Sequence, residues 1–140
     1  MASGLTFVDT NVLAYAHDRS ETVKQPVAAA LLARLWEARC GTLSTQVLQE
    51  FYVVATRKFK PPISSADARD IVALYGTWEV VEVDLALILA ASQLEEADAL
   101  SFWDALIVEA ARRSGANTLI SEDLQHGRVI AGIRIQNPFA

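Results

Sequence analysis

Four acidic residues stand where a carboxylate could carry out chemistry instead of only solvating the surface. Asp9 ends the apolar run of residues 5–8, and Asp123 follows a second apolar run at residues 118–120. Loops beyond the carboxyl ends of parallel strands hold the ligands of open α/β sheets, so both acids are candidate site residues. Each could instead cap the following helix or stabilise a turn.

The other two acids are expected on helices. Glu50 lies three residues after Val47 and four before Val54, on or beside the apolar stripe of its helix. An ionised carboxylate there is costly unless it is paired or bound to a cation, so Glu50 reaches solvent or an arginine, or it binds an ion. Asp104 follows Ser101 by three residues, a spacing that predicts a capping box at a helix start.

The side of its helix on which Asp104 lies also allows a role in a functional site. Asp104 shares a side with Ile107 and Val108, which places its carboxylate at the rim where the strands end. The other side is expected to face solvent and carries Glu109, Arg112 and Arg113.

Acids gathered at one rim would repel each other and raise one or more pKa values unless a cation joined them. Mg²⁺ and Mn²⁺ prefer oxygen ligands and are held by a few carboxylates, waters and substrate phosphate. A metal-bound water is a nucleophile suited to hydrolysis of a phosphodiester bond. The acids therefore predict a metal-dependent phosphodiesterase, in which the ions also bridge an acidic protein to a polyanion.

Composition favours a globular protein with one domain spanning residues 1–140. Hydrophobic residues make up 52% and charged residues 21%, and the net charge is −5 with a pI near 4.9. That charge would by itself argue against a nucleic-acid partner, but it does not describe a local site. With one cysteine, no membrane-spanning run and no signal peptide, we expect a cytoplasmic protein without a membrane partner.

Apolar periodicity and turn signals predict alternating strands and helices. The expected strands are residues 5–8, 42–44, 78–83, 118–120 and 133–138. The expected helices are residues 12–17, 26–36, 46–58, 66–75, 84–96 and 101–114. This alternation predicts a three-layer α/β/α fold around a mostly parallel, five-stranded sheet.

Four segments, in this order, resemble the PIN-domain family. They are residues 7–13 (FVDTNVL), 43–51 (LSTQVLQEF), 100–107 (LSFWDALI) and 119–124 (LISEDL). Within that family, their spacing looks like that of VapC-type toxins from bacterial toxin–antitoxin pairs. The resemblance covers essentially the whole chain.

The resemblance implies a five-stranded parallel sheet and a Mg²⁺- or Mn²⁺-dependent endoribonuclease that acts on RNA. It also implies a homodimer and a small antitoxin protein as partner. The family's catalytic and metal-binding acids fall on Asp9, Glu50, Asp104 and Asp123, which we call the acidic quartet. Supporting polar groups that orient water or ligand carboxylates would be Thr10 or Asn11, together with Ser121. Glu122 could substitute for Asp123 or assist it.

Two alternative functions remain to be weighed. A receiver-type phosphoacceptor domain needs a lysine near a late strand end, but the only lysines are Lys24, Lys58 and Lys60. A dehalogenase-type phosphatase also needs a second Asp two residues after the first, where this chain has Asn11. The other alternative is a catalytically silent module that binds a partner protein. Trp103 is expected in the core or at a dimer surface.

Overall fold

The computed structural model describes residues 4–140 and forms one six-stranded sheet. Its strands are β1 (Leu5–Val8), β2 (Gly41–Ser44), β3 (Glu79–Val81), β4 (Ala116–Ile120), β5 (Val129–Ile130) and β6 (Ile133–Gln136). They follow the order β3-β2-β1-β4-β6-β5, and every pairing is parallel except that of β5 with β6. The predicted mostly parallel sheet is confirmed.

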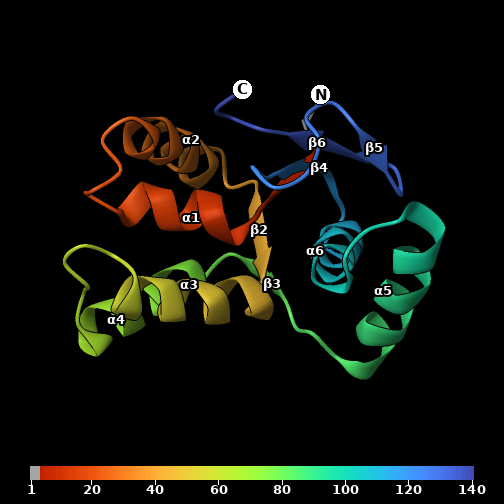
Figure 1. Ribbon diagram of the computed structural model, residues 1–140, viewed down its shortest axis with the longest axis horizontal. Helices are drawn as coiled ribbons and strands as arrows, with labels where there is room; N and C mark the ends of the chain where they lie inside the picture. The colour runs from red at the N-terminus through yellow and green to blue at the C-terminus, as the bar shows by residue number, and fades with distance from the viewer. Residues whose placement is uncertain (1–3) are drawn as a thin grey trace.

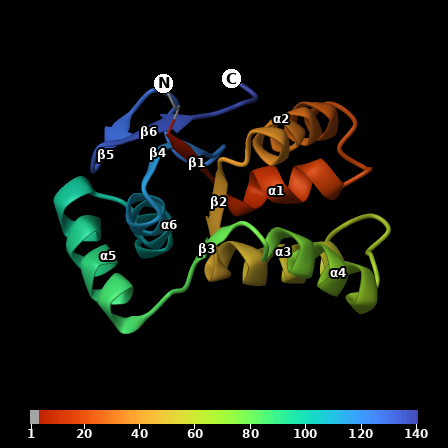
Figure 2. The same cartoon turned by 180° about the vertical axis from the view of Figure 1, so that it is seen from behind.

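Helices cover both faces of this sheet. They are α1 (Thr10–His17), α2 (Lys24–Ala38), α3 (Thr45–Arg57), α4 (Ser65–Tyr75), α5 (Leu85–Asp98) and α6 (Phe102–Arg113). In both views of the ribbon, α1 to α4 lie on one side of the sheet and α5 and α6 lie on the other (Figures 1 and 2). This is the three-layer α/β/α arrangement expected from the sequence. Among the described residues, no helix is both long and apolar enough to cross a bilayer.

The prediction of five strands was wrong by one. The additional strand, β5, has two residues and forms an antiparallel hairpin with β6. Ala131 and Gly132 join these strands, with φ values of 51° and 81°. Positive φ at both central positions is what a type I′ turn needs. Two residues are too few for a periodic pattern, and Ala-Gly is a weaker hairpin signal than Asn-Gly, so this strand could not be predicted from the sequence.

Serine side chains cap the starts of α3 and α6. The Ser44 hydroxyl accepts a hydrogen bond from Val47 N at 3.3 Å, and the Ser101 hydroxyl accepts one from Asp104 N at 3.1 Å. Helix α2 begins at Lys24, two residues before the predicted start at Pro26. Proline is tolerated anywhere in a first turn because the N–H it lacks would have no helical partner there.

The centre of the core is formed by strand residues from neighbouring strands. Phe7 and Val8 on β1 have no exposed surface, and neither have Leu43 on β2 and Leu119 on β4. These strands are buried because both faces of the sheet are covered by helices. The core therefore fixes β1 and β4 side by side, with their carboxyl ends at the same edge.

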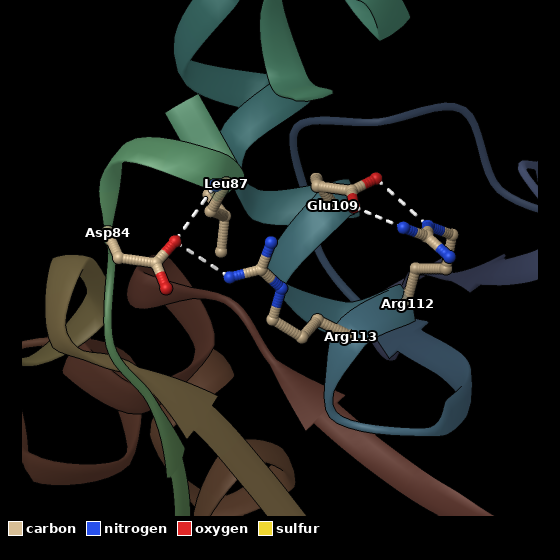
Figure 3. Close-up of polar contacts among 5 residues, drawn as sticks. All are labelled: Asp84, Leu87, Glu109, Arg112 and Arg113. Atoms are coloured by element: carbon tan, nitrogen blue, oxygen red, sulfur yellow. Dashed lines mark hydrogen bonds and ion pairs between the residues drawn. The ribbon is translucent and has the colours of Figure 1, made fainter. Parts of the chain in front are cut away.

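Helix α6 corrects one expectation. Glu109, expected to face solvent, is only 4% exposed. Helix α5 covers the side of α6 that faces away from the sheet, so α6 is buried nearly all round (Figure 1). The Arg112 guanidinium pairs with both carboxylate oxygens of Glu109, whereas Arg113 pairs with Asp84 at 2.8 Å near the start of α5 (Figure 3).

These two ion pairs should contribute very differently to stability. Replacing Arg112 with Ala leaves the buried Glu109 carboxylate without its guanidinium, which should lower the free energy of unfolding by about 1–3 kcal/mol. Replacing Arg113 with Ala removes a pair whose Asp84 side chain is 59% exposed and screened by solvent, so the loss should be clearly smaller. Urea denaturation of both variants measures the difference. Equal losses would show that Glu109 does not depend on Arg112.

Candidate active-site cleft

The site forms at β1, from which the chain adds strands first on one side of the sheet and later on the other. From β1 the chain proceeds to β2 and β3 on one side of the sheet, and later to β4 and β6 on the other. In parallel sheets this switch point leaves a crevice beyond the carboxyl ends of the strands. Val8 is in register with Ile120, and Asp9 N donates to Ile120 O at 3.0 Å. Asp9 therefore leaves β1 directly beside the loop that follows β4.

The Asp9 carboxylate is buried and has hydrogen-bond partners on both oxygens. Its Oδ1 accepts a hydrogen bond from Thr10 N at 2.7 Å, and its Oδ2 accepts one from the Ser121 hydroxyl at 2.8 Å. The side chain is 5% exposed and occupies the N-cap position of α1. The structural alternative, a helix cap, is thus present. It does not exclude a functional role, because Asp9 also lines a cleft.

Hydrogen bonds link Asp9 to two further acids of the quartet. Thr10, whose N–H binds Asp9, donates its hydroxyl to Glu50 Oε1 at 2.6 Å. The Ser121 hydroxyl, which donates to Asp9, accepts a hydrogen bond from the backbone N–H of Asp123 at 3.1 Å. Thr10 and Ser121 therefore connect β1, α3 and the loop after β4 in one network. Both are residues that the sequence indicated as supporting groups.

A cleft of about 670 Å³ lies beyond this network. All four members of the acidic quartet line it, as do Thr10 and Asn11. Asp9 comes from the end of β1, Glu50 from α3, Asp104 from the first turn of α6, and Asp123 from the loop after β4. Acids separated by more than one hundred residues are thus brought together at one rim.

Burial and mutual repulsion change the acidity of two of these groups. Burial raises the pKa of Asp9 from 3.8 to about 7, although hydrogen bonds from Ser121 and Thr10 oppose the rise. The nearby charges of Asp123 and Glu50 add to it. The pKa of Asp123 is also raised, first by partial burial and then by the charge of Asp104. The cleft is a region of unrelieved negative charge.

The donor atoms of the cleft suit a hard cation. Carboxylate, amide and hydroxyl oxygens are the ligands that Mg²⁺ and Mn²⁺ prefer. The buried atoms Asn11 Oδ1 and Gln46 Oε1 accept no hydrogen bond from any described residue, and both residues line the cleft. Between residues 4 and 140, however, no three Asp, Glu, His or Cys side chains already form a group that could hold an ion.

Glu122 lies outside the cleft lining. Tyr15 donates its hydroxyl to Glu122 Oε1 at 2.7 Å, and the Lys24 ammonium pairs with Glu122 Oε2. Lys24 therefore lies near the end of β4, although it comes early in the chain. Its position in the sequence was thus not a valid reason to exclude a receiver-type site. Yet Glu122 binds this lysine, and none of the described residues that line the cleft is Lys or Arg. The cleft still lacks the cation that a phosphoacceptor site needs.

The sequence did not indicate several parts of the cleft wall. Trp103, expected in the core or at a dimer surface, is 64% exposed and lines the cleft beside Asp104. Tyr15, Asp18 and Gln46 also line it. The useful signal for Gln46 was its spacing, because it lies one helical turn before Glu50 and donates to Glu50 Oε2 at 3.4 Å.

The family is established by comparison with known proteins. The family model of the PIN domain matches residues 6–131, so the chain belongs to the PIN-domain family. Among solved structures, it is similar to VapC20 of Mycobacterium tuberculosis, described as a toxin that cleaves the sarcin–ricin loop. The two share 24% identity and a TM-score of 0.63, covering 84% of this chain and 91% of that one.

Two further similar structures contain VapBC proteins bound to DNA. The one from Salmonella typhimurium has 17% identity and a TM-score of 0.68, covering 97% of this chain and 99% of that one. VapBC2 of Rickettsia felis, bound to a promoter fragment, has 17% identity and a TM-score of 0.66, covering 95% and 98%. At these identities the likeness demonstrates the shared fold. No curated protein gives a significant match.

The raised pKa of Asp9 predicts how the metal-free protein responds to pH. Because the folded pKa of about 7 exceeds the unfolded value of 3.8, the favourable contribution of protonated Asp9 is complete below pH 4 and lost by about pH 7. Asp9→Asn removes the charge and should be up to about 4 kcal/mol more stable than the parent at pH 8. The two should be similar at pH 4. Urea denaturation in EDTA at both pH values measures this, and an Asp9→Asn variant less stable at pH 8 would contradict it.

Proposed function

We propose that this chain is a divalent-metal-dependent endoribonuclease that hydrolyses phosphodiester bonds of RNA. Mg²⁺ or Mn²⁺ is the proposed cofactor. The observation that carries the proposal is the convergence of the acidic quartet on one cleft, with Asp9 buried at its base. Membership of the PIN-domain family adds to this support, since the similar VapC20 structure is described as that of an RNA-cleaving toxin.

The acidic quartet would hold the ion, with Asn11 as a further oxygen donor. When bound, Mg²⁺ or Mn²⁺ supplies an activated water and stabilises the negative charge that develops on the phosphate. Burial, and after it repulsion between the acids, raises the pKa of Asp9 and Asp123, and a bound cation would offset both effects by stabilising the charged carboxylates. Metal binding should therefore release protons near neutral pH.

The remaining residues of the network orient these acids. Thr10 fixes one oxygen of Asp9 and one oxygen of Glu50, and Ser121 fixes the other oxygen of Asp9. Such contacts hold a carboxylate in one rotamer and direct its free lone pairs into the cleft. Exposed Trp103 at the rim provides an aromatic face beside the acids, on which an RNA base could stack.

We further propose that the chain is the toxin of a toxin–antitoxin pair. The spacing of the PIN motifs supports this, as does the likeness to VapC20 and to two VapBC complexes along 95% and 97% of this chain. The expected partners are an RNA substrate, a cognate antitoxin protein and a second copy of the chain.

Substitution of the acidic quartet tests the proposed reaction. Each of Asp9→Asn, Glu50→Gln, Asp104→Asn and Asp123→Asn should lower the rate of RNA cleavage in Mn²⁺ by at least about 100-fold, because each removes a metal-binding charge. Cleavage is followed by mapping the new RNA ends. Glu96→Gln, on the exposed face of α5, is the matched control and should cleave normally. Undiminished cleavage by Asp9→Asn in excess EDTA would rule the reaction out.

Metal binding can be measured without RNA. Mn²⁺ at about 100 times its dissociation constant should stabilise the parent protein by about 2.7 kcal/mol, seen as a rise in melting temperature. Asp9→Asn should lose most of this rise, while Glu96→Gln keeps it. A melting temperature that does not respond to Mn²⁺ or Mg²⁺ would instead favour the silent binding module.

A further inference from the structure

Four side chains form a cluster around Glu122, in the loop that carries Asp123. Glu122 accepts a hydrogen bond from the Tyr15 hydroxyl at 2.7 Å and pairs with Lys24. The Lys24 ammonium lies 4.8 Å from the centre of the Tyr15 ring and 5.5 Å from that of Phe139. The Tyr15 and Phe139 rings contact each other edge to face at 5.4 Å. We call these four residues the Glu122 clamp.

The clamp and the Asp9 network hold the same short loop through consecutive residues. Ser121 is fully buried and donates to Asp9, while the backbone N–H of Asp123 donates to Ser121. The intervening residue, Glu122, has one oxygen bound by Tyr15 and the other by Lys24. With both neighbours fixed, little freedom remains for the backbone that presents Asp123 to the cleft.

Contacts of Glu122 argue against a role as a direct metal ligand. Both of its oxygens are engaged, its charge is balanced by Lys24, and it does not line the cleft. Tyr15 does line the cleft, so the clamp meets the site through this ring. The helices α1 and α2, which carry Tyr15 and Lys24, are thereby connected to the loop after β4.

We propose that Glu122, held by Tyr15 and Lys24, is a positioning residue that sets the orientation of Asp123 toward the cleft. This rests on the proposed function only in taking Asp123 to be a metal ligand. The Lys24 and Glu122 side chains are 35% and 24% exposed, and such partly exposed pairs contribute little to global stability. Loss of the clamp should thus loosen the loop without unfolding the protein.

Hydrogen exchange tests the clamp without metal or RNA. In Lys24→Met and Glu122→Gln, amides of residues 121–124 should exchange roughly fivefold faster or more, while amides of the central strands stay unchanged. The double variant should add little to either single one, because both remove the same contact. Matched controls are Arg34→Met, which removes an exposed charge from the same helix as Lys24, and Glu96→Gln. Unchanged exchange in both clamp variants would overturn the proposal.

Metal titration separates positioning from ligation. The Mn²⁺ concentration for half-maximal binding should rise about 10- to 100-fold in Lys24→Met and Glu122→Gln alike, and Lys24→Arg should restore it. Loss of binding in Glu122→Gln alone would make Glu122 a ligand and overturn the proposal. If the parent itself neither binds Mn²⁺ nor cleaves RNA, the proposed function fails. Exchange of residues 121–124 still decides whether the clamp holds the loop.

Discussion

The arrangement of the cleft is set by one buried carboxylate, Asp9, at the carboxyl end of the central strand β1. Asp9 follows the buried strand β1, and each of its oxygens accepts one hydrogen bond, from Thr10 and from Ser121. Its burial is unavoidable, because β1 pairs with β2 on one side and β4 on the other and helices cover both faces. An acid held there is stable only if it is protonated or compensated by positive charge.

This constraint extends outward through the groups that touch Asp9. The Thr10 hydroxyl donates a hydrogen bond to Glu50 on α3, and the Ser121 hydroxyl accepts one from the backbone N–H of Asp123. The result is a set of carboxylates that line one cleft, two of them held by hydrogen bonds from Thr10 and Ser121, with no lysine or arginine among the described residues that line it. Keeping these acids buried and close together lowers the stability of the folded state, which is typical of functional sites. The same oxygens are those that a hard divalent ion requires.

The sequence predicted much of this arrangement because its signals are local and strong. Apolar runs that end in acids correctly predicted the positions of β1 and β4, and the Ser101 cap predicted the start of α6. The alternation of strands and helices was enough to predict a mostly parallel sheet. Parallel neighbours then bring Asp9 and Asp123 to one edge as a matter of topology.

What the sequence missed depends on tertiary contacts. Glu109 is buried on α6, a helix that lies between α5 and the sheet (Figure 1), and no spacing within α6 reveals that placement. Trp103 is exposed at the cleft, which its apolar character did not indicate. Lys24 pairs with Glu122, which lies far from it in the chain. The two-residue strand β5 was too short to give a pattern. For Glu109 and for Lys24 the deciding contact comes from a segment outside the local sequence window.

Anomalous diffraction from crystals soaked in Mn²⁺ would show whether the cleft binds a divalent ion. We expect a manganese peak in the cleft at direct-ligand distance from an Asp9 oxygen, with a second oxygen from another member of the acidic quartet. Crystals of Asp9→Asn should show no such peak. A manganese ion bound elsewhere, or a cleft that stays free of it while Asp9 keeps its hydrogen bonds, would contradict the account.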